Sequence, residues 1–143
     1  MSTRFDELPV AAVAADRVVR VAPEATLHEV ADLLHGDDIG ALVVGIRQIV
    51  GVVTERDIVR ALAQRLDPAS TTAADIATRQ PVWCDASATV AEAAREMAER
   101  WVRHLLLEHE GRLVGIVSAR DLLGMCFDGN DGIDPSASGE AGR

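Results

Sequence analysis

The sequence predicts an α+β fold made of two copies of one β-α-β-β-α unit, packed together about a pseudo-twofold axis. Three observations carry this prediction: the chain repeats itself, both copies show the same order of apolar patterns, and the composition is that of a folded protein. The 143 residues are 48% hydrophobic and 26% charged, which is globular rather than disordered composition. Because only 3% are aromatic, we expect Val, Leu, Ile and Ala to build the core.

The internal repeat is the most informative of these features. Shifting the sequence by 63 positions places Thr26 on Thr89 and brings the surrounding residues into register. One residue is inserted in the second copy, and beyond it the shift is 64, so that residues 51–58 fall on residues 115–122. Chance does not produce such agreement, and two related units are therefore predicted.

Each copy carries the patterns of the same elements in the same order. Short apolar segments at 18–21 and 81–84 predict edge strands. Apolar residues at helical spacing predict helices that begin beside Thr26 and Thr89, both good N-cap residues. A hairpin of two strands and a closing helix are then predicted in each copy, at 41–44, 49–53 and 56–66 in the first and at 105–107, 113–117 and 120–125 in the second.

The chain thus divides into four predicted segments. Residues 8–66 form the first repeat, 67–71 a polar linker and 72–127 the second repeat. Residues 128–143 are acidic and contain few apolar side chains, so we expect a disordered tail. Because a unit of about 60 residues buries little core alone, we expect the two repeats to share one core.

Charge and cysteine content argue against several classes of function. A net charge of -9 disfavours nucleic-acid binding, which draws on a basic surface. No stretch approaches the roughly 18 apolar residues of a membrane span, and the first residues do not form a signal peptide, so a soluble protein is expected. The cysteines, Cys84 and Cys126, form no CxxC motif, and a reduced, cytoplasmic setting is the simpler interpretation.

The candidate site follows the last strand of each copy, where the pattern Gly-apolar-apolar-Thr/Ser-x-Arg-Asp occurs twice. A hydroxyl at the strand end and a carboxylate three residues later lie on one side of a helix's first turn. Such a carboxylate can accept hydrogen bonds from the diol of a ribose. The free N–H groups of that turn and the adjacent arginine favour a phosphate. The pattern therefore suits a nucleotide, with Thr54, Arg56 and Asp57 in the first copy and Ser118, Arg120 and Asp121 in the second.

The same spacing also has a purely structural interpretation. Thr-x-x-Asp and Ser-x-x-Asp resemble capping boxes, which satisfy the N–H groups of a helix start without any ligand. Capping does not explain the arginine between them in both copies. Repeats inherit residues from a common ancestor, however, so the two copies are not independent observations, and both interpretations stay open at this point.

The repeat order and this motif resemble a tandem pair of CBS domains, the family named after cystathionine β-synthase. Residues 39–43 and 103–105 are also similar to the central strand of that family, and the resemblance covers about residues 8–127. It implies a disc-like module that needs no cofactor and binds AMP, ADP, ATP or S-adenosylmethionine in clefts between the copies. It implies ribose contacts for Thr54, Asp57, Ser118 and Asp121, phosphate contacts for Arg56 and Arg120, and adenine contacts for Val19, Ala41, Val82 and His104.

The sequence departs from the family pattern at two places. Many members have proline in the central strand, where this chain has Val43 and Leu106. In addition, Glu55 precedes the arginine of the first motif, whereas the second motif has the neutral Ala119 there. A carboxylate repels a polyphosphate in a partly desolvated cleft. We therefore expect the second motif to bind anionic ligands better than the first.

Three classes of function are compatible with these residues to different degrees. The leading hypothesis is a stand-alone regulatory module, a homodimer that senses an adenosine ligand and signals to an effector protein. The alternative is a structural or protein-interaction module that binds no nucleotide.

We expect no enzyme, because no nucleophile and base can be assembled from neighbouring motifs. No metal site is expected either, because His104 and His109 lack partners at ligand spacing. Trp101 is expected at an interface between modules.

Overall fold

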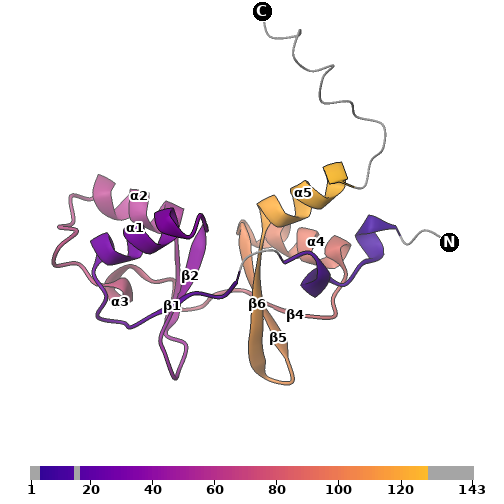
Figure 1. Cartoon of the computed structure of the whole chain (residues 1–143), viewed down its shortest axis with the longest axis horizontal. Helices are drawn as coiled ribbons and strands as arrows, with labels where there is room; N and C mark the ends of the chain where they lie inside the picture. Colours follow the sequence, from indigo (N-terminus) through magenta and orange to yellow (C-terminus); the bar gives the residue numbers. More distant parts are fainter. Residues whose placement is uncertain (1–3, 15–16, 129–143) are drawn as a thin grey trace, which may run out of the picture.

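The computed structural model describes residues 4–14 and 17–128, with side chains as far as residue 124 (Figure 1). The predicted tail from residue 129 onward lies outside the described residues. The predicted fold class is confirmed: two small sheets, each with its own helices, make up two repeats of the same topology.

The elements follow the predicted order in both repeats. The first repeat consists of β1 (Arg20–Val21), α1 (Leu27–Gly36), β2 (Ala41–Val44), β3 (Gly51–Thr54) and α2 (Glu55–Ala63). The second consists of β4 (Trp83–Asp85), α4 (Val90–Arg100), β5 (His104–His109), β6 (Arg112–Ser118) and α5 (Ala119–Asp128). Two 3-10 turns, η1 (Phe5–Glu7) and η2 (Val10–Ala12), precede β1, and a short helix α3 (Ala73–Ile76) precedes β4.

The two sheets have the same strand order and the same register. In each sheet the first strand pairs parallel with the second, which pairs antiparallel with the third through the predicted hairpin. Arg20 lies opposite Val43 in one sheet, and Trp83 lies opposite Leu106 in the other. These pairs are related by the same 63-residue shift as the sequence, so the repeat holds at the level of single backbone pairs.

Capping boxes set the start of most helices. The Thr26 hydroxyl accepts a hydrogen bond from the Glu29 N–H at 3.1 Å, and the Glu29 carboxylate accepts one from the Thr26 N–H at 3.1 Å. Both bonds satisfy groups that a helix start leaves without intrahelical partners. The same reciprocal pair occurs at Thr54/Asp57, Thr72/Asp75, Thr89/Glu92 and Ser118/Asp121.

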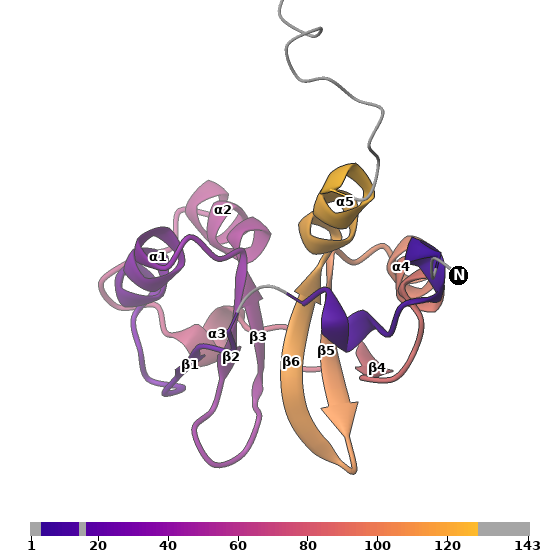
Figure 2. The same cartoon turned by 45° about the vertical axis from the view of Figure 1, so that its right-hand side comes forward.

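Each repeat is completed by the segment that precedes the first strand of the other repeat. The Val10 N–H donates to the Ala88 carbonyl at 2.7 Å, and the Ala73 N–H donates to the Ala25 carbonyl at 2.7 Å. The N-terminal segment therefore lies with the second repeat, where η1 is beside α4 and η2 is against β6 (Figure 2), while α3 lies with the first repeat. Val10 is fully buried there. The two repeats are consequently interlocked rather than placed side by side.

The core is divided into three clusters instead of the single shared core that we expected. The reason is strand alternation, which turns successive side chains to opposite faces of a sheet. Leu42 and Val44 of β2 face the helices of their own repeat, whereas Ala41 and Val43 face the other sheet. The central cluster between the two sheets consists of Ala41, Val43, Val52, Leu106 and Ile116.

Candidate ligand-binding cleft

A cleft of about 700 Å³ lies where the two predicted motifs meet. Figure 2 shows β3 leading into α2 and β6 leading into α5 at the same end of the two sheets. The first turns of both helices line the cleft, together with residues 78, 80–82 and 101–104 of the second repeat. Its volume falls within the range of about 300–1,000 Å³ that small-molecule sites occupy. Both copies of the motif thus contribute to one continuous cleft.

The carboxylate of the first motif, Asp57, is fully hydrogen-bonded at the start of its own helix. Asp57, only 7% exposed, accepts hydrogen bonds at Oδ2 from the Thr54 N–H at 2.9 Å and the Thr54 hydroxyl at 3.1 Å. Its Oδ1 accepts from Arg60 at 3.5 Å. Both oxygens of this carboxylate therefore already have partners.

The carboxylate of the second motif, Asp121, has fewer hydrogen-bond partners. Asp121 Oδ2 accepts from the Ser118 N–H at 2.8 Å, and the Ser118 hydroxyl accepts from the Asp121 N–H at 3.0 Å. Asp121 Oδ1 accepts no hydrogen bond from any residue that the structure describes. Ser118 lines the cleft, but Asp121, whose Oδ2 accepts from the Ser118 N–H, is not among the lining residues. The second carboxylate nevertheless keeps one oxygen for another donor.

Each motif leaves one backbone N–H for a ligand. The first N–H of α2, from Glu55, donates to the Gly40 carbonyl at 3.0 Å, and the third, from Asp57, donates to the Thr54 hydroxyl. The N–H of Arg56 between them has no partner among the described residues. The N–H of Arg120 in α5 likewise has no partner among the described residues. Its neighbours do have partners: the Ala119 N–H donates to the Arg103 carbonyl at 2.8 Å, and the Asp121 N–H donates to the Ser118 hydroxyl. The sequence suggested several free N–H groups, and the structure narrows these to one per helix start.

The cleft carries positive charge in an acidic chain. Four arginines line it, against the two carboxylates of Glu55 and Asp57. The whole chain has 23 acidic and 14 basic residues, so this local excess runs against the net charge. Within the described part of the chain, three of the four arginines, Arg56, Arg103 and Arg120, form no ion pair or hydrogen bond through their side chains. Unpaired guanidinium groups in a cleft favour an anionic ligand.

The structure brings together most, but not all, of the predicted site residues. Thr54, Arg56, Asp57, Ser118, Arg120, Val82 and His104 line the cleft. Val19 and Ala41 do not. Val19 packs against the core of the first repeat, and Ala41 is buried in the central cluster because its position in β2 faces the other sheet.

Several lining residues were absent from the sequence prediction. Arg60 stands one helical turn after Asp57, a spacing that could have drawn attention to it. Trp101 and Arg103 line the cleft because the connection between α4 and β5 passes along its edge. Gly40 lies close to His104: a Cβ atom at Gly40 would stand 3.0 Å from His104 Nε2 and 3.5 Å from Glu55 Oε1.

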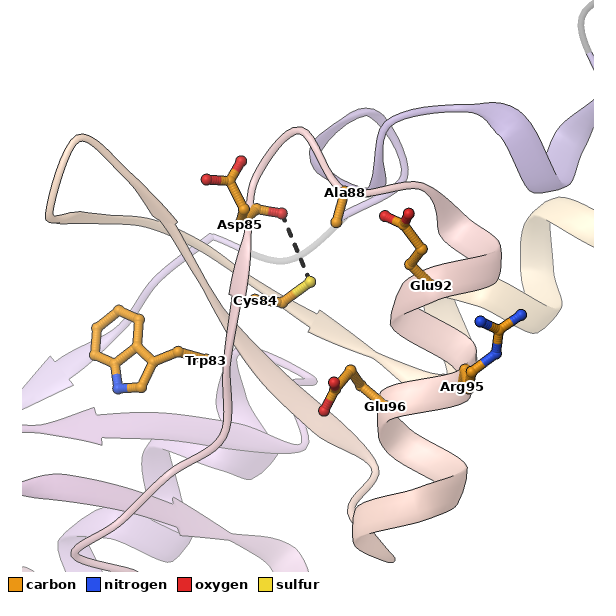
Figure 3. A pocket seen from close by; sticks show the side chains of 7 residues that line it. All are labelled: Trp83, Cys84, Asp85, Ala88, Glu92, Arg95 and Glu96. Atoms are coloured by element: carbon orange, nitrogen blue, oxygen red, sulfur yellow. Dashed lines mark hydrogen bonds between the residues drawn. The ribbon is translucent and has the colours of Figure 1, made fainter.

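A second, smaller pocket of about 360 Å³ lies between β4 and α4 (Figure 3). Its walls include Cys84 and three carboxylates, those of Asp85, Glu92 and Glu96. Burial raises the pKa of the Cys84 thiol, and the nearby carboxylates, Glu96 first among them, raise it further. This surface repels anions and holds a thiol with little thiolate character. Within residues 4–14 and 17–128, no group of three or more His, Cys, Asp or Glu residues could hold a metal ion.

The fold and the cleft define a class of proteins built from paired β-α-β-β-α repeats with a ligand cleft between them. The chain belongs to the CBS domain family, whose pattern it matches at residues 10–64 and 73–127. No helix in the described part of the chain is long and apolar enough to cross a membrane.

Comparison with individual proteins supports the same assignment. The chain is 37% identical over 108 residues to hypoxic response protein 1 of Mycobacterium tuberculosis, covering 73% of this chain and 76% of that protein. An uncharacterized conserved protein from Pyrococcus horikoshii has a similar structure, with a TM-score of 0.79, 29% identity and coverage of 85% of this chain and 93% of that one. A CBS domain protein from Pyrobaculum aerophilum, complexed with AMP, gives a TM-score of 0.72 and 32% identity over 84% of this chain and 99% of that one.

Proposed function

We propose that this CBS domain pair is a cytoplasmic regulatory module that binds an adenosine-containing ligand in its cleft and signals the bound state to a partner protein. The observation that carries this proposal is the cleft itself: it joins both motif-bearing helix starts and gathers three guanidinium groups that have no partner among the described residues, in a chain of net charge -9. The similar structure from Pyrobaculum aerophilum that holds AMP gives independent support for the ligand class.

The ligand's parts find matching groups in the cleft. The N–H and guanidinium of Arg120 bind a phosphate at the start of α5. The Ser118 hydroxyl lies in the cleft beside the ribose, and Asp121, which is hydrogen-bonded to Ser118 next to the lining, accepts from the ribose diol at Oδ1. The base lies against the apolar wall that Val82 and Leu106 provide. The second motif is the stronger site because Asp121 keeps a free oxygen, whereas both oxygens of Asp57 are occupied and Glu55 adds negative charge.

Signalling follows from the position of the cleft between two helices. A ligand that contacts the starts of both α2 and α5 favours the arrangement of the two repeats that best fits it. It shifts the equilibrium only by its difference in affinity for the two arrangements. The exposed side chains of Val59 and Leu62 on α2 provide an apolar surface for a second copy, in keeping with a homodimer. The proposal assigns no catalysis to the chain.

A module that binds no nucleotide is the second candidate, and the capping boxes favour it. Thr26/Glu29 and Thr89/Glu92 form the same reciprocal bonds at exposed positions outside the cleft. Thr72/Asp75 forms them with an aspartate, also outside the cleft, so helix capping explains the Thr/Ser-x-x-Asp spacing at Thr54, Thr72 and Ser118. What capping leaves unexplained is the set of unpaired arginines around the two boxes in the cleft.

Thermal unfolding of the purified protein tests the proposal. AMP, ADP, ATP and S-adenosylmethionine are added separately, with GMP and GTP as controls. An adenosine ligand at 100 times its Kd should stabilise the folded chain by about 2.7 kcal/mol and raise the midpoint accordingly. The absence of any shift at millimolar concentration would favour the interaction module. Hydrolysis of ATP during incubation would instead point to an enzyme.

A further inference from the structure

Trp101 is the most unusual residue of the cleft. It caps the C-terminus of α4 in the left-handed conformation, with φ 57° and ψ 38°, and it is 90% exposed. A bulky residue at positive φ is a backbone outlier that costs free energy. A large aromatic side chain so exposed gains almost nothing from burial in the chain alone. Yet the residue lines the cleft.

The first repeat shows what the fold requires at this position. The 63-residue shift places Asp38 on Trp101, and Asp38 is also left-handed, with φ 51°. Both sites are followed by the same closing bond: Ile39 N–H donates to Leu34 at 3.0 Å, and Val102 N–H donates to Met97 at 3.1 Å. The helix end therefore explains the left-handed backbone in both repeats. It does not explain tryptophan, since Asp, Asn and Gly adopt this conformation far more readily.

The cleft offers a reason for an aromatic side chain at this place. Phosphate and ribose have partners at the helix starts, but the apolar wall for a base consists of aliphatic side chains such as Val52, Val82 and Leu106. Among the Phe and Trp residues whose side chains the structure describes, which are Phe5, Trp83 and Trp101, only Trp101 lines the cleft, where His104 adds the smaller imidazole ring. Nucleobases stack favourably on aromatic rings, and tryptophan offers the largest such surface.

We propose that Trp101 is a ligand-binding residue whose indole ring stacks on the base of the bound nucleotide at the rim of the cleft. This inference rests on the proposed function. Stacking depends on the π face of the base and not on its hydrogen-bonding edge. Trp101 therefore adds affinity for purines in general, while the choice of adenine over guanine is made elsewhere in the cleft.

The chain's two tryptophans allow a direct test by fluorescence. Trp83 lines the other pocket (Figure 3) and is not among the residues that line the cleft. In the Trp83→Phe protein the emission comes from Trp101 alone, and we expect it to be quenched on titration with AMP or ATP. In the Trp101→Phe protein the emission comes from Trp83 and should not respond. Emission of the Trp83→Phe protein that stays constant while AMP binds would overturn the inference.

A glycine substitution separates stacking from backbone strain. Trp101→Gly relieves the left-handed strain, so the unfolding midpoint of the free protein should rise by about 3 °C. Its affinity for AMP should nevertheless fall about tenfold, the loss of one base–aromatic stack. Asp38→Gly is the matched control: it makes the same change at the equivalent helix end of the first repeat, outside the cleft, and should leave AMP affinity unchanged.

The outcomes distinguish this inference from the function on which it rests. Unchanged AMP affinity in Trp101→Gly, in a protein whose wild type binds AMP, overturns the role of Trp101 and leaves the proposed function standing. A wild-type protein that binds no adenosine ligand overturns both. A Trp101 that serves instead as a protein docking residue would give a glycine variant that binds AMP normally.

Discussion

The backbone of Thr78 is hydrogen-bonded in both directions to Val52: Val52 N–H donates to the Thr78 carbonyl at 3.0 Å, and Thr78 N–H donates to the Val52 carbonyl at 2.9 Å. Thr78 belongs to the segment that leads into the second repeat, whereas Val52 belongs to β3 of the first. Both residues line the cleft. This pair of bonds therefore joins the two repeats along one wall of the cleft.

Glycine at position 51 is required by this contact. A Cβ atom there would collide with the Thr78 carbonyl oxygen, which is backbone and has no room to move aside. We expect Gly51→Ala to lower the free energy of unfolding by about 3 kcal/mol and to weaken ligand binding as the wall shifts. Urea unfolding measures the first effect, and calorimetric titration with AMP measures the second.

The repeat supplies the control for this substitution. Gly115 is the equivalent residue of β6, but a Cβ atom there would meet only the Leu107 side chain, at an ordinary 3.5 Å. Gly115→Ala should change stability by less than about 1 kcal/mol. Equal losses in the two variants would show that the Thr78 contact does not matter.

The interlocking of the repeats predicts that the N-terminal segment stabilises the second one. Val10 is fully buried among Val90, Met97 and Leu105. Val10→Ala should therefore lower the free energy of unfolding by about 2 kcal/mol, measured by urea unfolding. Val114→Ala, at a side chain 52% exposed on β6, should change it by less than about 0.5 kcal/mol. A Val10→Ala protein as stable as the wild type would contradict the exchange of segments.

The phosphate contact assigned to Arg120 predicts a loss that depends on the ligand's charge. Arg120→Gln should weaken ATP about tenfold, because it removes a charge-assisted hydrogen bond. The affinity for adenosine, which has no phosphate, should stay within about twofold. Arg112→Gln, in the exposed hairpin between β5 and β6, removes the same charge outside the cleft and should alter neither affinity. If both variants weakened ATP binding equally, the effect would come from the net charge of the chain, and the phosphate contact of Arg120 would be contradicted.

The raised pKa of Cys84 predicts slow thiol chemistry. Burial, and then Glu96, hold the thiol protonated above its ordinary pKa near 9. In a Cys126→Ser protein, Cys84 should react with a disulfide reagent at pH 8 more slowly than free cysteine does. Glu96→Gln should speed the reaction about twofold by removing a repulsive charge, while Glu99→Gln on the same helix should not. A rate equal to that of free cysteine would contradict the raised pKa.

The raised pKa of Cys84 also determines the direction in which the free energy of unfolding changes with pH. The folded-state pKa of Cys84 lies above the unfolded-state value, so the unfolded chain loses this proton first as the pH rises. The contribution of Cys84 to the free energy of unfolding is therefore fully present below its unfolded-state pKa. It is lost as the pH rises through its folded-state pKa. From pH 8 to 10 the wild type should lose more stability than Cys84→Ser does, as urea unfolding at each pH would show.

The sequence predicted the fold well because the elements of each repeat depend on local sequence patterns. Thr26 and Thr89 start helices as expected, since N-capping depends on residues within one turn. The end of α2 was less predictable. The helix stops at Ala63 rather than near residue 66, because Arg65 turns left-handed at φ 64° and Leu66 N–H bonds back to Ala61. No glycine marks that turn in the sequence.

What the sequence could not supply were the long-range partners. The apolar residues around Val10 carry no sign that they pack on the second repeat rather than the first. Likewise, the position of Ala41 within its strand did not reveal which face of the sheet it takes, and it lies in the central cluster instead of the cleft. Trp101 was expected at an interface between modules, but its place on the cleft emerges only once α4 and β5 are positioned. The boundaries of the four chain segments stay a prediction.

The central claim is that an adenosine ligand binds in the cleft through Asp121, and calorimetric titration with AMP tests it most directly. Asp121→Asn retains an oxygen that can cap the Ser118 N–H but replaces the second acceptor oxygen with a donor. Asp75→Asn makes the same change in the capping box of α3, outside the cleft. The account predicts that AMP binds the wild type and Asp75→Asn alike, and Asp121→Asn about tenfold more weakly. Equal binding by all three proteins, or by none, would contradict it.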